Sequence, residues 1–188
     1  MSAIDITTPR LLLITPTRSF YTAWREAHLG AGPAQTLSDF EPREPEALSE
    51  EAFDALLDRL AWLRSQGSHG ISILDRQSRA QLGTLSLFDR VDGPSKNIFL
   101  GYHIFNQHWG QGFATEAVAG AKQIVFEDFD LHRIEALVEV DNTASTRVLE
   151  KNGFRLEGTA KRRLFRRGEW RDALIYALTA EEYEPPSY

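Results

Sequence analysis

The chain of 188 residues contains no cysteine. This absence excludes a disulfide scaffold, a cysteine nucleophile and a metal site with thiolate ligands, and it fits a reducing compartment. Long apolar runs are also missing, because no stretch approaches the ~20 residues that a helix needs to cross a bilayer. The segment from Met1 to Asp5 has neither the basic nor the apolar region of a signal peptide. The sequence therefore predicts a cytoplasmic protein without a membrane partner.

Basic residues are also fewer than acidic ones, because the chain has 21 Lys and Arg residues and 27 Asp and Glu residues. Its formal net charge is −6. A nucleic-acid-binding domain normally presents a basic face that neutralises phosphates, so no direct binding of nucleic acid is expected. An acidic surface favours cationic partners such as amines or basic proteins. The content of 42% hydrophobic and 26% charged residues is typical of a globular protein, and the length predicts one domain over residues 1–188.

A metal-binding pattern is also absent. No two histidines form a paired spacing such as H-E-x-x-H, so the sequence predicts no metal. The five histidines are His28, His69, His103, His108 and His132.

The apolar residues follow strand and helix periodicities in a clear order along the chain. Strands are expected over residues 8–14, 70–74, 81–88, 97–105 and 133–140 and in two runs within 154–178. Helices are expected over 19–28, 49–66, from 113 to about 126–130, and over 141–151. The polar segment 37–46 is expected to be a loop. The early strands suggest antiparallel pairing, whereas the strand–helix–strand unit over 97–140 requires a right-handed parallel crossover. The predicted fold class is therefore α/β, with a mixed, mostly antiparallel sheet of six to seven strands and helices on both faces.

A glycine-bearing loop joins the strand over 97–105 to the helix that follows it. Gly110 and Gly112 allow the backbone to approach an anion closely, and a helix N-terminus adds unpaired N–H groups and the positive end of its dipole. A Walker A motif would need Gly-Lys-Ser/Thr at the end of the loop, and Thr115 stands where a dinucleotide fingerprint would have Gly or Ala. The loop is predicted to bind a phosphate group of another kind, with a simple strand-to-helix turn as the alternative.

Two motifs resemble those of the GCN5-related N-acetyltransferase (GNAT) superfamily. The run from Gln107 to Ala117, Gln-x-x-Gly-x-Gly-Phe-Ala-Thr-Glu-Ala, resembles its acetyl-CoA pyrophosphate loop. The run from Asn142 to Phe154 looks like its N-x-x-S-x-x-x-x-E-K-x-G-F segment. Segments 8–13, 157–158 and 168–172 are similar to the RimJ/RimL branch, which acetylates the N-termini of ribosomal proteins. The resemblance covers nearly the whole chain and implies a GNAT-type fold in which a central parallel pair of strands splays apart.

The resemblance also implies that acetyl-CoA is the co-substrate and indicates how it is bound. The backbone N–H groups of the glycine loop would hold the pyrophosphate, and the backbone of Ile104 and Phe105 would pair with the pantetheine arm where the strands splay. Asn142 would hydrogen-bond the pantetheine, and Ser145 would place its hydroxyl near the sulfur. The implied cofactor-binding residues are Ile104, Phe105, Gln107, His108, Trp109, Gly110, Gln111, Gly112, Phe113, Ala114, Thr115, Asn142 and Ser145.

The reaction that the resemblance implies is direct attack of a neutral primary amine on the thioester. The departing thiolate then needs a proton, and the incoming ammonium needs a base. Ser145 is the candidate proton donor, with a helix-capping role as its alternative. His103 and Glu139 are the candidate bases, with a sheet residue and a surface ion pair as their alternatives. Trp24 and Tyr102 are candidates for lining the acceptor slot, although core packing would explain both aromatic side chains.

The identity of the acceptor is open at the level of sequence. The RimJ/RimL resemblance favours the α-amine of a protein, such as the N-terminus of a basic protein. The alternatives are a small amine, transfer of a longer or acidic acyl group, and a CoA-binding module without activity. A homodimer is a further expectation. The basic run Lys161–Arg163, with Arg166 and Arg167, is either a solvated hairpin or a contact to an anionic substrate or nucleotide phosphate.

Overall fold

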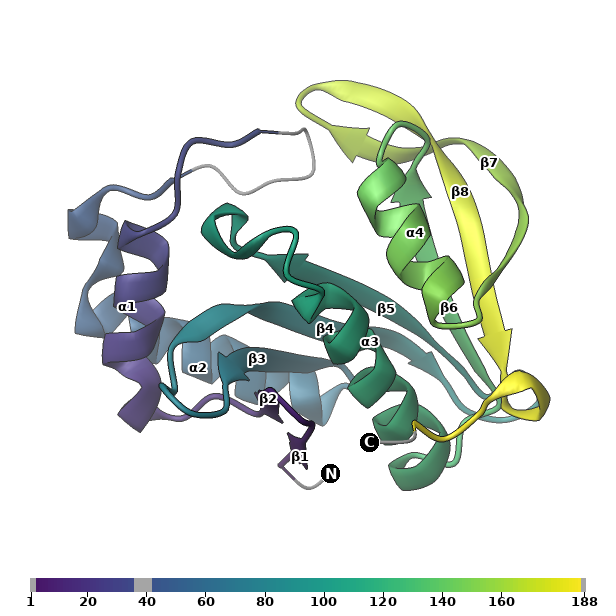
Figure 1. Cartoon of the computed structure of the whole chain (residues 1–188), viewed down its shortest axis with the longest axis horizontal. Helices are drawn as coiled ribbons and strands as arrows, with labels where there is room; N and C mark the ends of the chain where they lie inside the picture. The colour runs from purple at the N-terminus through teal and green to yellow at the C-terminus, as the bar shows by residue number, and fades with distance from the viewer. Residues whose placement is uncertain (1–2, 36–41, 187–188) are drawn as a thin grey trace.

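The computed structural model describes residues 3–35 and 42–186 and arranges them around one eight-stranded sheet (Figure 1). The strands lie in the order β1-β2-β3-β4-β5-β6-β8-β7. Their bounds are Asp5–Thr7 (β1), Leu11–Ile14 (β2), His69–Asp75 (β3), Gln81–Val91 (β4), Asn97–Ile104 (β5), Arg133–Glu139 (β6), Arg155–Arg166 (β7) and Glu169–Thr179 (β8). The α-helices are Tyr21–Leu29 (α1), Glu50–Ser65 (α2), Phe113–Gln123 (α3) and Thr143–Lys151 (α4).

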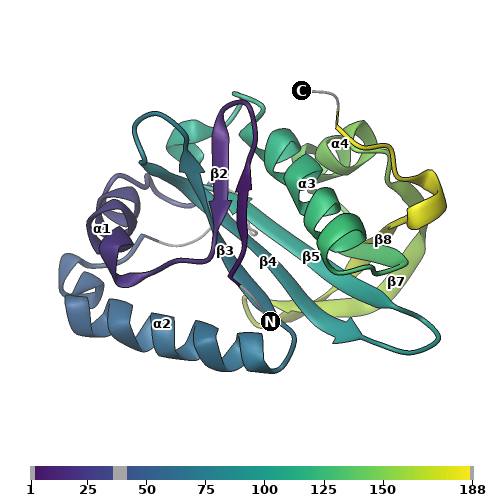
Figure 2. The same ribbon diagram turned by 90° about the horizontal axis from the view of Figure 1, so that it is seen from below.

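Helices cover both faces of the sheet, as the periodicities predict (Figure 2). α3 and α4 lie on one face, and α1 and α2 lie on the other. The main core forms where Ala117 and Ala121 of α3 and Leu149 of α4 meet the apolar side chains of the central strands. A smaller cluster is centred on Trp24 and Phe53 of the two remaining helices. Within the described ranges, no helix combines the length and the apolar composition that a membrane span requires.

The centre of the sheet opens between β5 and β6. These strands are parallel, but their pairing covers only Asn97↔Arg133 to Phe99↔Glu135. β5 then continues to Ile104 while it stays bound to β4, so its other edge has lost its neighbouring strand. The structure thus confirms the predicted α/β fold with a central parallel pair that splays apart.

The structure adds one strand to the seven that the sequence predicts, because the short and mostly polar segment Asp5–Thr7 pairs with β2. The helix expected from residue 19 begins with the 3-10 turn Arg18–Phe20, and α1 follows it. The helix expected from residue 113 to about 126–130 ends in the π-helical turn Ile124–Asp128. Within the loop expected over 37–46, a 3-10 turn starts at Pro45, and residues 37–41 lie outside the described residues.

Candidate active site

The glycine loop has the geometry of an anion-binding turn. After β5 the chain forms the 3-10 turn Asn106–His108 and reaches α3 through Gly110 and Gly112, whose φ angles are +74° and +79°. These are left-handed conformations that favour glycine. Gly112 is the N-cap of α3 and offers no side-chain cap, so the first N–H groups of the helix stay available to a ligand.

A clamp formed by Thr8, Arg10 and Glu116 holds this loop in place. The Glu116 carboxylate accepts hydrogen bonds from the Thr8 hydroxyl at 2.6 Å, the Arg10 backbone N–H at 2.7 Å and Arg10 Nε at 2.7 Å. Arg10 also donates from Nη1 to the carbonyl of Gln111 at 3.0 Å. Burial alone would raise the pKa of Glu116, but the hydrogen bonds from Thr8 and Arg10 hold it below its ordinary value. The segment before β2 thereby fixes the start of α3.

The clamp predicts a pH-dependent loss of stability in Glu116→Gln. The amide of glutamine would face the Arg10 guanidinium with a donor, so we expect unfolding in urea at pH 7 to cost about 1–2 kcal/mol less than in the wild type. Because the folded-state pKa of Glu116 is lowered, the carboxylate stabilises the protein above its unfolded pKa and ceases to do so as the pH falls through the folded value. The difference between the two proteins should therefore shrink below about pH 4.

Glu26→Gln is the matched control for this prediction, because Glu26 is an exposed carboxylate of α1. We expect it to change the free energy of unfolding by no more than about 0.5 kcal/mol. An equal loss in both variants would argue against the clamp.

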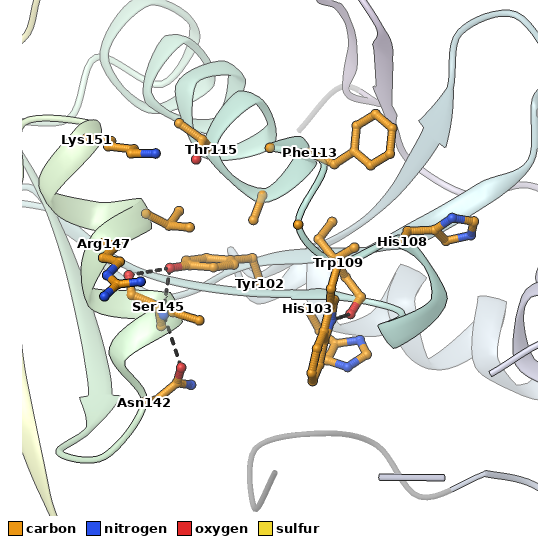
Figure 3. Close-up of a pocket in the computed structure, with 16 residues that line it drawn as sticks. Tyr102, His103, His108, Trp109, Phe113, Thr115, Asn142, Ser145, Arg147 and Lys151 are labelled. Carbon is orange, nitrogen blue, oxygen red and sulfur yellow. Dashed lines mark hydrogen bonds between the residues drawn. The ribbon is translucent and has the colours of Figure 1, made fainter. Parts of the chain in front are cut away.

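A pocket of about 550 Å³ lies between the glycine loop, the splayed edge of β5 and helix α4 (Figure 3). Most of the residues implied for the cofactor meet in it, together with Tyr102 and His103. The predicted residues that line it are Tyr102, His103, Ile104, His108, Trp109, Gly110, Gly112, Phe113, Ala114, Thr115, Asn142 and Ser145. The sequence motifs thus converge on one cavity.

Four of the expected residues do not line this pocket. Trp24 is only 4% exposed and packs at 5.0 Å against the Phe53 ring, so the expectation that it lines the acceptor slot is corrected. Gln107 turns toward α1 and donates to the Ala27 carbonyl at 3.4 Å, where it ties the loop to that helix. Phe105 is buried, and its N–H donates to Leu82 of β4, so this N–H is not available to a pantetheine arm. Gln111 contributes its carbonyl to the clamp described above.

Trp109 covers the splayed edge of β5. Its indole N–H donates to the carbonyl of Ile104 at 2.6 Å. Since the N–H of Phe105 points to β4, the alternation of a strand directs the backbone groups of Tyr102 and Ile104 toward the gap left by β6. The Ile104 N–H therefore faces the pocket, while its carbonyl is occupied by a side chain of the same loop.

Two hydroxyl groups form a pair at the other side of the pocket (Figure 3). Tyr102 Oη lies 2.7 Å from Ser145 Oγ, and it also donates to the Ser145 carbonyl at 3.2 Å. Burial raises the pKa of Tyr102 to about 12, even though the hydrogen bond to Ser145 acts in the opposite sense. Tyr102 therefore stays protonated at physiological pH. Asn142 caps α4 by accepting the Ser145 backbone N–H at 3.0 Å, which leaves its amide nitrogen beside the pocket.

The two candidate bases differ in their surroundings. His103 lines the pocket with its ring edge-on to Phe105, at a centroid distance of 5.6 Å. Glu139 is 4% exposed, and its carboxylate lies 3.5 Å from Arg166 and 3.4 Å from Arg171. The surface ion pair named as the alternative for Glu139 is thus present, although the carboxylate itself is buried. Among the described residues, no group of three or more His, Asp or Glu side chains could hold a metal ion.

Sequence reasoning missed Arg147 and Lys151, two cations that α4 directs to the pocket. Neither side chain forms an ion pair with a described residue, and each carries a charge suited to a phosphate group. The signal that could have found them is the i, i+4 spacing that follows the capping residue Asn142, because it places both on one face of the helix.

Comparison with known proteins gives a consistent family. The protein-family model described as acetyltransferase (GNAT) domain matches residues 11–155. The probable N-acetyltransferase YjcK of Bacillus subtilis is 41% identical over 97 residues, which are 52% of this chain and 54% of YjcK. The chain therefore spans about half the length of this relative. The [ribosomal protein uS5]-alanine N-acetyltransferase of Escherichia coli is 30% identical over 165 residues, which are 87% of this chain and 85% of that protein.

The fold agrees with that of a solved structure. The structure of Mycobacterium smegmatis RimJ in complex with CoA-disulfide superposes with a TM-score of 0.76 and 27% identity. The match covers 92% of this chain and 83% of the RimJ chain. The family match extends from β2 to the start of β7 and includes both motifs and every element that lines the pocket. The chain therefore belongs to the acetyltransferase (GNAT) domain family, whose relatives named above are N-acetyltransferases.

Proposed function

We propose that this chain is an acetyl-CoA-dependent N-acetyltransferase whose acceptor is the N-terminal α-amine of a protein. The observation that carries the proposal is the pocket, which joins an anion-binding loop to a hydroxyl pair across the gap in the sheet. A ligand that fills it must have phosphate groups at one end and a group that needs a proton donor at the other. Acetyl-CoA has both, because its pyrophosphate is joined to a thioester by an extended arm.

The residues of the pocket suit acetyl-CoA along its length. The glycine loop and the N-terminus of α3 would hold the pyrophosphate, and Arg147 and Lys151 would add positive charge beside it. The N–H of Ile104 and the amide nitrogen of Asn142 would bind the pantetheine arm. The Trp109 indole occupies the Ile104 carbonyl. It would have to leave this carbonyl before the arm could bind both the N–H and the carbonyl of Ile104.

The chemistry that we propose uses the hydroxyl pair as a proton donor. As the amine attacks the thioester, a C–N bond forms and the C–S bond breaks, so the sulfur leaves as a thiolate. Ser145 donates its proton to the sulfur and takes one from Tyr102 at 2.7 Å, and Tyr102 regains a proton from solvent when the products leave. Backbone N–H groups of β5 at the gap polarise the carbonyl of the thioester. His103, on the opposite side of the strand from Tyr102, accepts the proton of the amine directly or through water.

Support for a protein acceptor comes from the relatives. The E. coli protein that aligns with 87% of this chain is named for an alanine of ribosomal protein uS5, and M. smegmatis RimJ shares 27% identity with this chain. A ribosomal acceptor also agrees with the predicted cytoplasmic location. The homodimer, like that location, stays a prediction.

A thiol-release assay tests the proposed function. Acetyl-CoA is supplied with a panel of peptides with free α-amines and with a panel of small amines, and free CoA thiol is followed over time. We expect turnover with peptides and its loss when their α-amine is blocked. Turnover of small amines alone, or a preference for a longer acyl-CoA, would favour those alternatives. Calorimetric binding of CoA without turnover of any amine would indicate a binding module.

The indole of Trp109 gives a direct optical prediction for this pocket. Trp109 is the one tryptophan among the described residues that lines it, whereas Trp24 is buried in the core and Trp62 and Trp170 are exposed elsewhere. Addition of CoA should change the tryptophan fluorescence of the wild type, and Trp109→Phe should abolish most of that change. Trp62→Phe serves as the control and should retain it. A full response in Trp109→Phe would mean that CoA binds away from this loop.

A further inference from the structure

The hairpin of β7 and β8 carries a concentration of positive charge that the proposed reaction does not use. Residues 161–172 contain six Lys and Arg side chains against two carboxylates, in a chain with a formal net charge of −6. The local charge of the hairpin is therefore opposite to that of the whole chain. The net charge favours basic partners, but a partner responds first to the charge that it meets beside the site.

A bulge in β7 presents part of this charge. Three residues, Lys161 to Arg163, lie opposite Asp172 alone. The Asp172 carboxylate accepts hydrogen bonds from Lys161 Nζ at 2.7 Å and from the backbone N–H of Arg162 at 2.9 Å, which fixes the bulge. Arg162 and Arg163 are exposed, and their guanidinium groups form no ion pair with a described residue. The bulge therefore holds the guanidinium groups of Arg162 and Arg163 at the surface, where they can bind an anionic group.

The hairpin is also tied to the turn that carries the hydroxyl pair and its cap. Arg166 and Arg171 both approach the buried carboxylate of Glu139 at the end of β6. Arg171 also pairs with Asp141 at 3.0 Å, directly before the capping residue Asn142. Glu139 thus acts as an anchor that ties the basic hairpin to the turn before Asn142.

This anchor lies on the face of the sheet from which an acceptor must come. Val138 belongs to the core beneath α3 and α4, so by alternation Glu139 points to the opposite face. His103 points to that face as well, since Tyr102 reaches α4 on the other. The cofactor pocket is lined by α3 and α4, so the open route for an amine to the thioester is the side of His103. The arginines that reach Glu139 flank this route.

We propose that the basic hairpin selects acceptor polypeptides with acidic side chains in the residues that follow the acetylated N-terminus; this inference rests on the proposed function. Guanidinium groups bind carboxylates through paired, charge-assisted hydrogen bonds. The exposed rings of Phe165 and Trp170, 5.2 Å apart across the strands, add apolar surface for neighbouring side chains.

Charge also distinguishes an acidic peptide from RNA as the occupant. RNA carries a phosphate at every nucleotide, so a bound strand would extend from the hairpin over the acidic remainder of the surface and be repelled there. A peptide with one or two carboxylates can engage the hairpin without that penalty. The observations therefore favour an acidic polypeptide.

The test compares three peptides that share the same first residue and carry glutamate, glutamine or lysine at positions three to five. Acetylation is followed by thiol release at low ionic strength in the wild type and in Arg163→Glu. We expect the wild type to prefer the glutamate peptide. Arg163→Glu should lower kcat/KM for the glutamate peptide about fivefold or more, through a higher KM. The same variant should raise kcat/KM for the lysine peptide and leave that for the glutamine peptide unchanged, which also shows that the variant is folded.

Arg59→Glu is the matched control, because Arg59 is an exposed arginine of α2 and the charge change is the same. An equal response of both variants, or no peptide preference in the wild type, overturns the inference. Unchanged peptide kinetics with weaker binding of a single-stranded RNA oligonucleotide to Arg163→Glu overturns it in favour of RNA. If small amines are acetylated and no peptide is, the proposed function itself fails, and this inference fails with it.

Discussion

Ser145→Ala should lower kcat by about 10²–10³ while the affinity for CoA changes little. The hydroxyl is the group nearest to a leaving sulfur in the proposed arrangement, and its removal also deprives Tyr102 of its 2.7 Å partner. The backbone N–H of Ser145 keeps its bond to Asn142, so α4 should remain capped. Rapid-mixing kinetics with acetyl-CoA and a good acceptor would measure the chemical step, and calorimetry would measure the binding of CoA.

Thr146→Val is the control for this variant, because it removes the neighbouring hydroxyl, which bonds to the Thr143 carbonyl. It should leave kcat within about twofold of the wild type, in line with a surface substitution. Tyr102→Phe should lower kcat as Ser145→Ala does, and the double variant should lose little more, since two members of one relay are not additive. Additive losses would show that the two hydroxyls act separately.

The raised pKa of Tyr102 sets the pH range over which the pair can act. A group with a pKa of about 12 is protonated throughout the neutral and mildly alkaline range. The rate should therefore show no loss from Tyr102 up to about pH 10, and a rise toward a plateau with increasing pH should report the deprotonation of the amine or its base. Ser145→Ala should lower the plateau without moving the pH at which the rate rises.

Gly83→Ala should reduce the free energy of unfolding by about 3 kcal/mol. A Cβ at Gly83 would lie 2.1 Å from the carbonyl oxygen of His103 and 2.9 Å from Cα of Ile104. Both are backbone atoms, so no rotation of a side chain relieves the contact, and β4 would have to separate from β5. Because β5 carries Tyr102 and His103, activity should fall together with stability.

Gly158→Ala provides the matched control for Gly83→Ala. Gly158 also lies in a strand, but a Cβ there meets no atom within 4 Å. Its substitution should change the free energy of unfolding in urea by no more than about 0.5 kcal/mol. Similar values for the two variants would mean that the β4–β5 pair can widen at little cost.

The sequence predicted those features that depend on local pattern. The glycine loop is read from neighbouring residues, and the structure gives Gly110 and Gly112 the left-handed φ angles that such a loop requires. Parallel pairing of β5 and β6 also follows from chain order, because a strand–helix–strand unit with one crossover leaves few other arrangements.

The sequence did not predict contacts that depend on which neighbouring element packs against a given face of a strand or helix. Alternation separates Tyr102 from His103, but only the position of α4 decides that the tyrosine meets Ser145. The same holds for Trp24, because its position on the apolar face of a helix is compatible both with lining an acceptor slot and with packing in the core. The clamp joins Arg10 to Glu116 across more than a hundred residues of chain, and no periodicity reports such a contact.

The unpaired edge of β5 has a consequence for the stability of the protein. Amide groups without a neighbouring strand exchange with solvent more readily than those of a complete sheet, and a ligand that pairs with them takes the place of the missing strand. Under the proposed function, acetyl-CoA at a hundred times its Kd would add ~2.7 kcal/mol to the free energy of unfolding. The concentration of this ligand would then set the stability of the enzyme as well as its rate.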